Sequence, residues 1–348
     1  MELKYKTPEI NLSHVKKMTT DFGMIQFCII NQPDLSTGYT LDDNARALIA
    51  MCMHYERSGD KADVPYIERY LNVIKYCQQP EGNFLNYVDT ERGFTEQNSE
   101  NLSDSNGRAV WALGFLMSKQ HLFSKDLIAM ADTIFQRALF CVESLHSTRT
   151  MAFVIKGLYY YNLEKKSFAE THLITQLADR IVQMYRHEAE PKWHWFESYL
   201  TYGNSILPEA LLFAYLDTGD VVYRDIAKES FDFLLKLTFN ESRIKVISNR
   251  GWLHKGHEAE EHGEQPIDVA YTILALREFY AVFKEKTYKT KMDTAFNWFL
   301  GNNHLHQIIY NPLTGGCYDG LEDTHVNLNQ GAESTLSYLM ARLTIEKN

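Results

Sequence analysis

The chain has 348 residues, 45% of them hydrophobic, which is enough to form one large domain or two ordinary ones. It carries 35 Lys and Arg against 45 Asp and Glu, for a formal net charge of −10 at pH 7. Because nucleic acids and anionic membranes are bound by clustered basic residues, this balance disfavours both as partners. No segment approaches the ~18 apolar residues of a membrane helix. The five cysteines are scattered, and no signal-peptide pattern is seen, so we expect a cytoplasmic protein with reduced thiols.

Apolar residues recur at helical spacing along almost the whole chain, which predicts an all-α protein. Ser124 and Asp220 are expected to be N-caps, and Pro65 to lie in a first helical turn. In chain order, helices are predicted near residues 10–20, 45–58, 65–79, 106–119, 125–145, 150–162, 167–187, 208–218, 221–238, 267–284, 287–300 and 331–346.

Six of these helices begin with the same kind of phrase, in which a polar loop carrying a carboxylate or amide leads into an Ala- and Leu-rich stretch. The first two phrases share Asn, a small residue, Arg and Ala, at Asn44–Ala47 and Asn106–Ala109. A repeat at intervals of roughly 45 to 64 residues indicates one helical hairpin per unit. The phrases lie at residues 42–47, 104–109, 147–152, 202–209, 265–270 and 329–334.

The connections between helices alternate in length, which favours a particular packing of the hairpins. Short links join each repeated helix to its partner, whereas the returns are usually long, and long loops commonly carry function. A single hairpin cannot bury its apolar stripe, so the units must pack side by side. We therefore expect residues 1–348 to form one (α/α)6 toroid of six hairpins and twelve helices, with the repeated helices as the inner ring. An open solenoid is the structural alternative.

The strongest local signal is the acid pair Asp42 and Asp43, which stands beside Tyr39 and Arg46 at a predicted helix N-terminus. One aspartate of such a pair commonly caps the helix. Asp104 and Arg108 occupy the matching places in the second repeat, and the third repeat offers Arg149 instead of an acid.

The later repeats supply Glu209, Asp268 and Glu333 in first helical turns, each of which could also be ordinary helix-start chemistry. Paired carboxylates across a cleft are what glycoside cleavage requires, one to protonate the leaving oxygen and one to attack carbon or activate water. His257 and His262 have no recognised ligand spacing and no nearby Cys, so neither a metal nor another cofactor is expected.

The motifs resemble a bacterial family of the six-hairpin glycosidase superfamily, which also occurs as a C-terminal domain of group 1 glycosyltransferases. Its motif positions here are Asp42, Asp43, Asp104, Glu209, Asp268 and Glu333. The resemblance implies the toroidal fold and a carbohydrate site, and it suggests a functional link to a glycosyltransferase. The segments that carry it are 38–47, 103–113, 202–211, 251–257, 265–268, 298–301, 315–321 and 329–335.

The combined prediction is a glycoside hydrolase that acts on an oligosaccharide. Glu209 or Glu333 would be the general acid, and Asp43 or Asp268 the base. Trp193, Trp195 and Trp252 are expected to stack on sugar rings. The other expected substrate-binding residues are Tyr39, Asp42, Arg46, Asp104, Arg108, Arg149, Tyr202, His254, Gln265 and Gln330.

Three alternatives remain open at this point. A sugar epimerase or isomerase on the same toroid would use histidines as acid and base, with His194, His254 and His257 as the candidates. A non-catalytic glycan-binding domain serving a glycosyltransferase would bind sugar without breaking a bond. A helical terpenoid cyclase is disfavoured by the polar loops.

Overall fold

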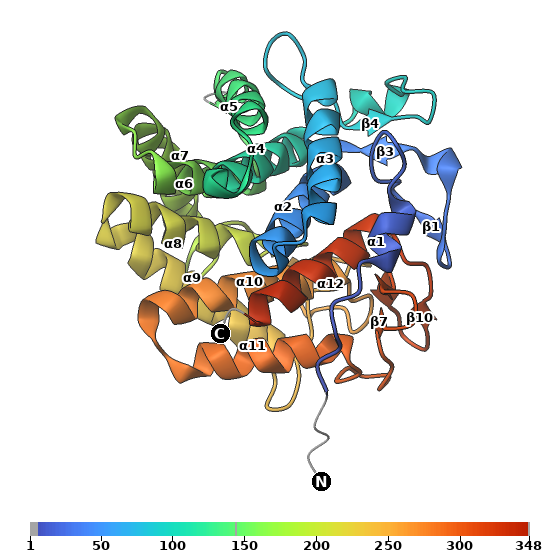
Figure 1. The fold of residues 1–348 in the computed structure, drawn as a ribbon. Helices are drawn as coiled ribbons and strands as arrows, with labels where there is room; N and C mark the ends of the chain where they lie inside the picture. The colour runs from blue at the N-terminus through green and yellow to red at the C-terminus, as the bar shows by residue number, and fades with distance from the viewer. Residues whose placement is uncertain (1–5, 143–144, 347–348) are drawn as a thin grey trace.

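The computed structural model describes residues 6–142 and 145–346, and helices make up most of it (Figure 1). Twelve α-helices lie in this described part of the chain, as predicted. In chain order they are α1 Ser13–Met18, α2 Leu41–Ser58, α3 Val64–Cys77, α4 Ser103–Met117, α5 Lys125–Leu139, α6 Thr148–Glu164, α7 Phe168–Glu188, α8 Ile206–Thr218, α9 Val221–Thr238, α10 Pro266–Phe283, α11 Lys286–Phe299 and α12 Ala332–Ile345.

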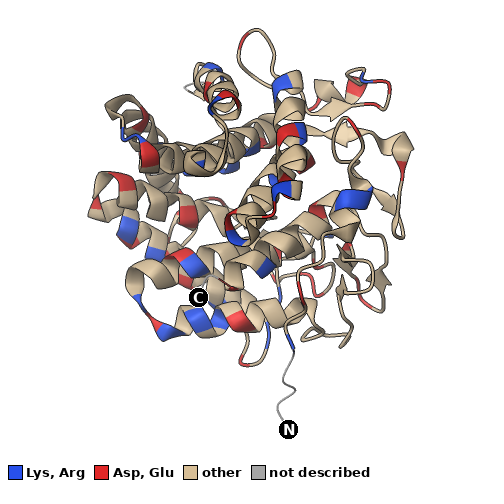
Figure 2. Ribbon diagram, in the orientation of Figure 1, with Lys and Arg blue, Asp and Glu red and all other residues tan. Residues whose placement is uncertain are grey.

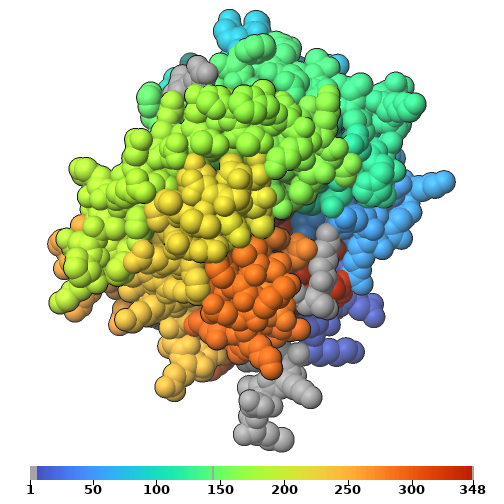
Figure 3. All heavy atoms as spheres, turned by 90° about the vertical axis from the view of Figure 1, so that its left-hand side faces the viewer, coloured from blue at the N-terminus to red at the C-terminus, as the bar shows by residue number. Residues whose placement is uncertain are grey.

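The helices form two concentric rings. The inner ring consists of α2, α4, α6, α8, α10 and α12, each packed against the next, and α12 packs back against α2. Each inner helix from α2 to α10 is paired with the following outer helix of its hairpin, and α1 packs against α12. The ring is therefore closed, and the protein is an (α/α)6 toroid rather than an open solenoid. Figure 3 shows consecutive segments of the α7 to α11 region packed one below another.

The burial of each ring follows from its sequence pattern. The outer helix α3 buries Ile67, Tyr70, Leu71 and Ile74, the spacing of a single apolar stripe. The inner helix α8 is instead buried continuously over residues 206–214. An outer helix faces solvent on one side, so it can carry charged residues there, and Figure 2 shows both acidic and basic residues along these helices.

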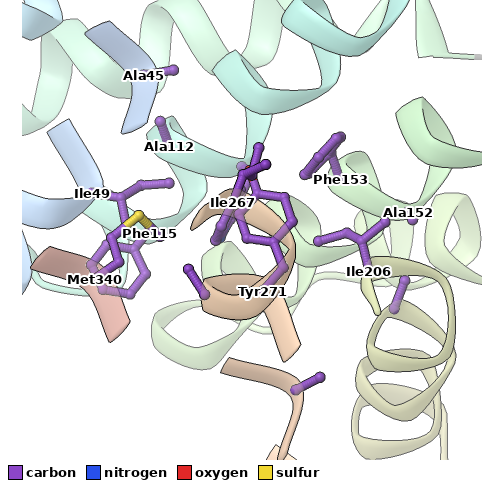
Figure 4. Close-up of a cluster of buried hydrophobic side chains, with 14 of the residues drawn as sticks. Ala45, Ile49, Ala112, Phe115, Ala152, Phe153, Ile206, Ile267, Tyr271 and Met340 are labelled. Atoms are coloured by element: carbon purple, nitrogen blue, oxygen red, sulfur yellow. The ribbon is translucent and has the colours of Figure 1, made fainter. Parts of the chain in front are cut away.

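The centre of the toroid is filled by side chains from every inner helix (Figure 4). Tyr271 of α10 reaches across the ring to Trp111 of α4, with ring centroids 6.0 Å apart in an edge-on arrangement. It also meets Phe153 of α6 at 6.1 Å. The toroid is consequently a packed core and not a pore, and any site must lie at one of its ends.

Helices α4 and α6 make an especially close approach through Gly114 and Gly157. A methyl group on Gly157 would lie 2.5 Å from the carbonyl oxygen of Val110. We expect Gly157→Ala to lower the free energy of unfolding by about 1–3 kcal/mol, because two backbones would have to move apart. Urea unfolding tests this, with Gly320→Ala as the control, since its methyl group would meet nothing closer than 3.5 Å. Equal losses in both variants would contradict the prediction.

The helix termini confirm two predicted caps. The side chain of Ser124 accepts a hydrogen bond from the N–H of Leu127 at the start of α5, and Asp220 accepts one from Val222 at the start of α9. Four of the five cysteines are buried, and Cys141 is partly exposed. Within residues 6–142 and 145–346, no helix is both long and apolar enough to cross a membrane.

The long loops join one another around the end of the toroid where the inner helices begin. The loops pair through short antiparallel ribbons and through isolated bridges such as that between Glu264 and Leu321. Single backbone hydrogen bonds also join them, such as the one from the N–H of Ala332 to the carbonyl of Gln26. The ribbons pair β1 Cys28–Ile29 with β2 Gln32–Pro33, β3 Tyr39–Thr40 with β4 Tyr87–Val88, β5 Tyr199–Leu200 with β6 Leu253–His254, β7 Tyr310–Asn311 with β8 Gly316–Cys317, and β9 Gly320–Leu321 with β10 Val326–Asn327.

Candidate active-site cleft

A polar cleft with two lobes opens where the inner helices begin. The lobes share Asp42, Asn86 and Tyr87 and have volumes of about 380 and 300 Å³. The first lobe is also lined by Gln26, Phe27, Thr40, Asp43, Arg46, Asn249, Gln265, Asp319, Glu322, Asn327, Gly331, Glu333 and Ser334. The second lobe is also lined by Asn101, Leu102, Asp104, Ser105, Arg108, Ser147, Arg149, Tyr199, Thr201, Tyr202 and Trp252.

The repeated Asn-x-Arg phrase has a structural explanation in this cleft. Asn44 and Asn106 each bind the backbone of the incoming long loop, at Met24 and Phe84 respectively. Two residues later, each arginine reaches back to an acid of the preceding inner helix in the ring. Arg46 contacts Glu333 of α12, and Arg108 contacts Asp42 of α2.

Neither aspartate of the first repeat is needed as a helix cap. Thr40 is the N-cap of α2, and its hydroxyl accepts a hydrogen bond from the N–H of Asp43 while donating to Asp43 Oδ2 at 2.7 Å. Both carboxylates therefore stand in the first helical turn at the cleft, with other roles available to them.

The two neighbouring aspartates have opposite electrostatic settings. Asp42 is contacted through both oxygens by Arg108 Nη1, at 2.9 and 3.0 Å. Burial opposes ionisation of Asp42, but the cations of Arg108 and Arg46 prevail and hold its pKa below the ordinary value. Burial raises the pKa of Asp43 to about 7, with Arg46 opposing the shift and Glu333 adding to it.

Arg46 is the single cation shared by two acids of the first lobe. Its Nη1 lies 3.0 Å from Asp43 and its Nη2 lies 2.7 Å from Glu333. The Arg46 side chain is almost fully buried, whereas that of Glu333 is 41% exposed. Glu333 can therefore meet a bound ligand directly, and Arg46 fixes its orientation.

Asp268, which is buried, and Asp319, which is half-buried, add two further acids. Asp268 accepts a hydrogen bond from the N–H of Gly203 at 2.6 Å, yet burial still raises its pKa to about 7. Asp319 accepts from the N–H of Gly331 at the start of α12, and burial raises its pKa as well. Asp319 lines the first lobe, whereas Asp268 is not among the residues that line either lobe.

The second lobe brings together six of the predicted binding residues, namely Asp42, Asp104, Arg108, Arg149, Tyr202 and Trp252. Asp104 accepts hydrogen bonds from the hydroxyls of Tyr202, Ser147 and Thr150. Arg149 donates to the carbonyl of Tyr202 at 2.9 Å and pairs with Glu197 at 3.1 Å, so its charge is balanced within the protein. Trp252 also lines this lobe.

Three residues expected at the site are buried and do not line either lobe of the cleft. Trp195 is fully buried, and Trp193 is only 6% exposed and packs edge-on against Phe233, so neither offers a stacking face. Glu209 is also buried, and its carboxylate is held 2.9 Å from the ammonium group of Lys156. Because Glu209 lines neither lobe of the described cleft, the geometry favours other residues as the general acid.

Three predicted binding residues lie outside the described lining of the cleft. Tyr39 is buried, with its hydroxyl 2.9 Å from that of Thr20. Gln330 is buried and accepts from the hydroxyl of Thr314. His254 is exposed on β6. Gln265, by contrast, does line the first lobe.

The structure also adds residues that the sequence did not single out. Asn86 and Tyr87 reach both lobes from the long loop between α3 and α4, and pairing of β3 with β4 puts them there. The pairing partner of a two-residue strand leaves no sequence signal. Asp319, in contrast, did have a sequence signal, because it lies in the glycine-rich 315–321 segment.

The described lining of this cleft offers little support for catalysis by histidine or by a metal ion. Among the residues described as lining the two lobes there is no histidine. His194 instead pairs with Glu229 at 2.9 Å. Over residues 6–142 and 145–346, no group of three His, Cys, Asp or Glu side chains is arranged to hold a metal ion.

The fold has close counterparts among solved structures, although no protein-family model and no curated protein matches the sequence. Cellobiose 2-epimerase from Bacillus thermoamylovorans is similar over 97% of this chain and 95% of its own, with a TM-score of 0.74 and 11% identity. D-mannose isomerase is similar over 96% of this chain and 95% of its own, with a TM-score of 0.73 and 12% identity.

An α-1,6-mannanase from Salegentibacter sp. is also similar, with a TM-score of 0.61 and 12% identity over 96% of this chain and 95% of that one. The structure is of an inactive variant, with two adjacent aspartates replaced, in complex with α-1,6-mannotriose. At these identities the likeness establishes the six-hairpin toroid, and the chemistry has to be argued from the cleft.

Proposed function

We propose that this protein is a carbohydrate-active enzyme, and specifically a glycoside hydrolase that cleaves a neutral oligosaccharide with Asp42 and Asp43. The observation that carries the proposal is a pair of adjacent carboxylates at the cleft, of which Asp42 is held by Arg108 through both oxygens and Asp43 is buried against Thr40 and Arg46. These settings shift the pKa of Asp42 down and that of Asp43 up. Two carboxyl groups whose environments separate their pKa values are the mark of an acid and a base working together.

In the proposed reaction, Asp43 carries a proton near neutral pH and donates it to the glycosidic oxygen as the bond to the anomeric carbon breaks. Asp42 stays ionised and either attacks that carbon or removes a proton from water. Where Asp42 removes a proton from water, the hydroxyl group ends on the anomeric carbon, Asp42 passes the proton to solvent, and Asp43 takes one up again. Where Asp42 attacks, water then displaces it from the anomeric carbon and gives its proton to Asp43. Glu333, oriented by Arg46, accepts hydrogen bonds from sugar hydroxyls beside them.

The comparison with the mannanase supports an aspartate pair in this role. In that structure, replacing two adjacent aspartates accompanies an inactive enzyme on the same fold. The first repeat here carries two adjacent aspartates at the start of an inner helix. The bound mannotriose in that structure also supports an oligosaccharide as the substrate class.

A sugar epimerase or isomerase is the second candidate, because the epimerase and the isomerase superimpose with the higher TM-scores, 0.74 and 0.73 against 0.61. Epimerisation through histidines needs imidazoles at the substrate, and the described lining of the cleft holds none. We therefore prefer hydrolysis. If the protein were instead a non-catalytic glycan-binding domain that partners a glycosyltransferase, it would bind the oligosaccharide without cleaving it to produce a new reducing end.

The proposed acid makes a prediction about pH. The acid form of Asp43 is present below its pKa of about 7, so kcat/KM should fall as pH rises above about 7. On the acidic side, kcat/KM should fall only below the ordinary aspartate range, where Asp42 takes up a proton. Initial rates between pH 3.5 and 9 measure the alkaline limb, and they should show no fall on the acidic side down to the ordinary aspartate range. Activity that keeps rising to pH 9 would exclude Asp43 as the acid.

A further inference from the structure

An exposed aromatic side chain stands in the second lobe of the cleft. Trp252 stacks on Tyr199, with ring centroids 5.2 Å apart and an interplanar angle of 27°. It nevertheless remains 53% exposed, although large aromatic side chains are usually buried. One indole face is thus supported by protein while much of the ring stays open to the cleft.

The position of Tyr199 beneath Trp252 is fixed by backbone pairing between two strands. Tyr199 begins β5, which pairs with β6 directly after Trp252, so the β5–β6 ribbon fixes both rings. The backbone N–H of Lys255 donates to Ser198, which fastens the end of the same ribbon. A stacking platform held in this way loses little conformational entropy when a ligand binds.

The charged groups around the platform already have partners within the protein. Arg149 is paired with Glu197, and Arg108 with Asp42. Asp104 is satisfied by three hydroxyl donors. Because no described charge in this lobe lacks a partner, a ligand with its own charge would have nothing to pair with. Hydroxyl groups, in contrast, can exchange hydrogen bonds with the polar rim.

We infer that the second lobe is a binding subsite for a neutral sugar ring, which stacks on Trp252 next to the residue that carries the chemistry. The inference rests on the proposed function for the position of the reaction, since Asp42 lines both lobes. The enzyme therefore acts on chains long enough to occupy both lobes, and it selects neutral sugars over uronic acids at the second.

Binding to the Asp43→Asn variant tests the subsite without turnover. Calorimetric titration would use neutral gluco-, manno- and galacto-oligosaccharides of one to four units and oligosaccharides of uronic acids. We expect the best neutral trisaccharide to bind at least about tenfold more tightly than its monosaccharide, the scale of one aromatic contact. The oligouronates should show no such gain.

Trp252→Ala, added to Asp43→Asn, should remove the gain with chain length, and Trp252→Phe should keep part of it. Phe168→Ala is the matched control, because Phe168 is 89% exposed on α7 and lies outside the described cleft. The inference is overturned if no oligosaccharide of the panel binds, if monosaccharide and trisaccharide bind equally, or if the gain survives in Trp252→Ala.

The subsite and the hydrolase can fail separately. Suppose that binding depends on chain length and on Trp252, but the wild-type protein leaves every linkage intact. This result would support the subsite and contradict the hydrolase proposal. If the wild-type protein cleaves the oligosaccharide but binding does not depend on Trp252, the hydrolase proposal is supported and the subsite is contradicted.

Discussion

Asp43→Asn should lower kcat on a cleavable oligosaccharide by about 10²–10⁴-fold, the usual contribution of a general acid. Asparagine matches the shape of the protonated carboxyl group and can still contact Thr40 and Arg46, but it has no proton to give. The fold should therefore survive while the chemistry is lost. Steady-state kinetics together with a thermal melt would measure both.

The matched control for this variant is Asp220→Asn. Asp220 also stands at a helix start, but it caps α9 on the outer ring, and asparagine caps equally well. We expect its kcat to equal that of the wild-type protein. If Asp43→Asn kept more than about a tenth of wild-type kcat, a general-acid role for Asp43 would be ruled out.

Lys156→Met should lower the free energy of unfolding by about 3–5 kcal/mol, because it leaves Glu209 buried without its partner. The Lys156 ammonium group is fully enclosed, 2.9 Å from Glu209 and 3.9 Å from the centroid of the Trp111 ring. Burial, opposed by Lys156, raises the pKa of Glu209 to about 6, so the carboxylate is mainly ionised at pH 7.5. Denaturant unfolding at that pH measures the loss.

The sign of the pH effect provides a second readout. Without Lys156, the folded-state pKa of Glu209 rises further above its unfolded value, so the variant should lose less stability at pH 5 than at pH 7.5. The double variant Lys156→Met with Glu209→Leu should recover most of the loss, since both buried charges are gone. Lys236→Met on the exposed face of α9 is the control.

A loss within about 0.5 kcal/mol of that control would show that the Lys156–Glu209 pair does not hold the inner ring together. Glu209→Gln with wild-type turnover per folded molecule would separately support a structural role for this residue. Loss of turnover without loss of stability would return Glu209 to the candidate catalytic groups.

The architecture could be predicted from the sequence because the signals for it are local. Helix periodicity, the caps at Ser124 and Asp220, and the alternation of short and long connections each describe neighbouring residues. Side-by-side packing followed from the need of each hairpin to bury its stripe, and the acids at the repeated helix starts favoured a closed ring over an open solenoid. The repeated Asn-x-Arg phrase likewise marked side chains that line the cleft, Arg46 and Arg108.

The sequence did not reveal contacts between elements far apart in the chain. Glu209 looked like a cleft acid, and its buried partner Lys156 lies on the neighbouring inner helix α6, which only the ring geometry reveals. Trp193 and Trp195 looked like sugar platforms, but their loop folds inward, and the indole N–H of Trp193 donates to the carbonyl of Glu197. Composition alone does not tell which aromatic of a loop faces the cleft.

Proton NMR of the wild-type protein incubated with neutral gluco-, manno- and galacto-oligosaccharides, with and without phosphate, tests hydrolysis most directly. We expect the anomeric signal of one linkage to disappear and new reducing-end signals to grow equally in both conditions, with the first anomer reporting inversion or retention. Intact linkages with signals of a sugar epimerised at its reducing end would contradict the account and establish the epimerase. Intact linkages with unchanged sugars across the panel would contradict it too.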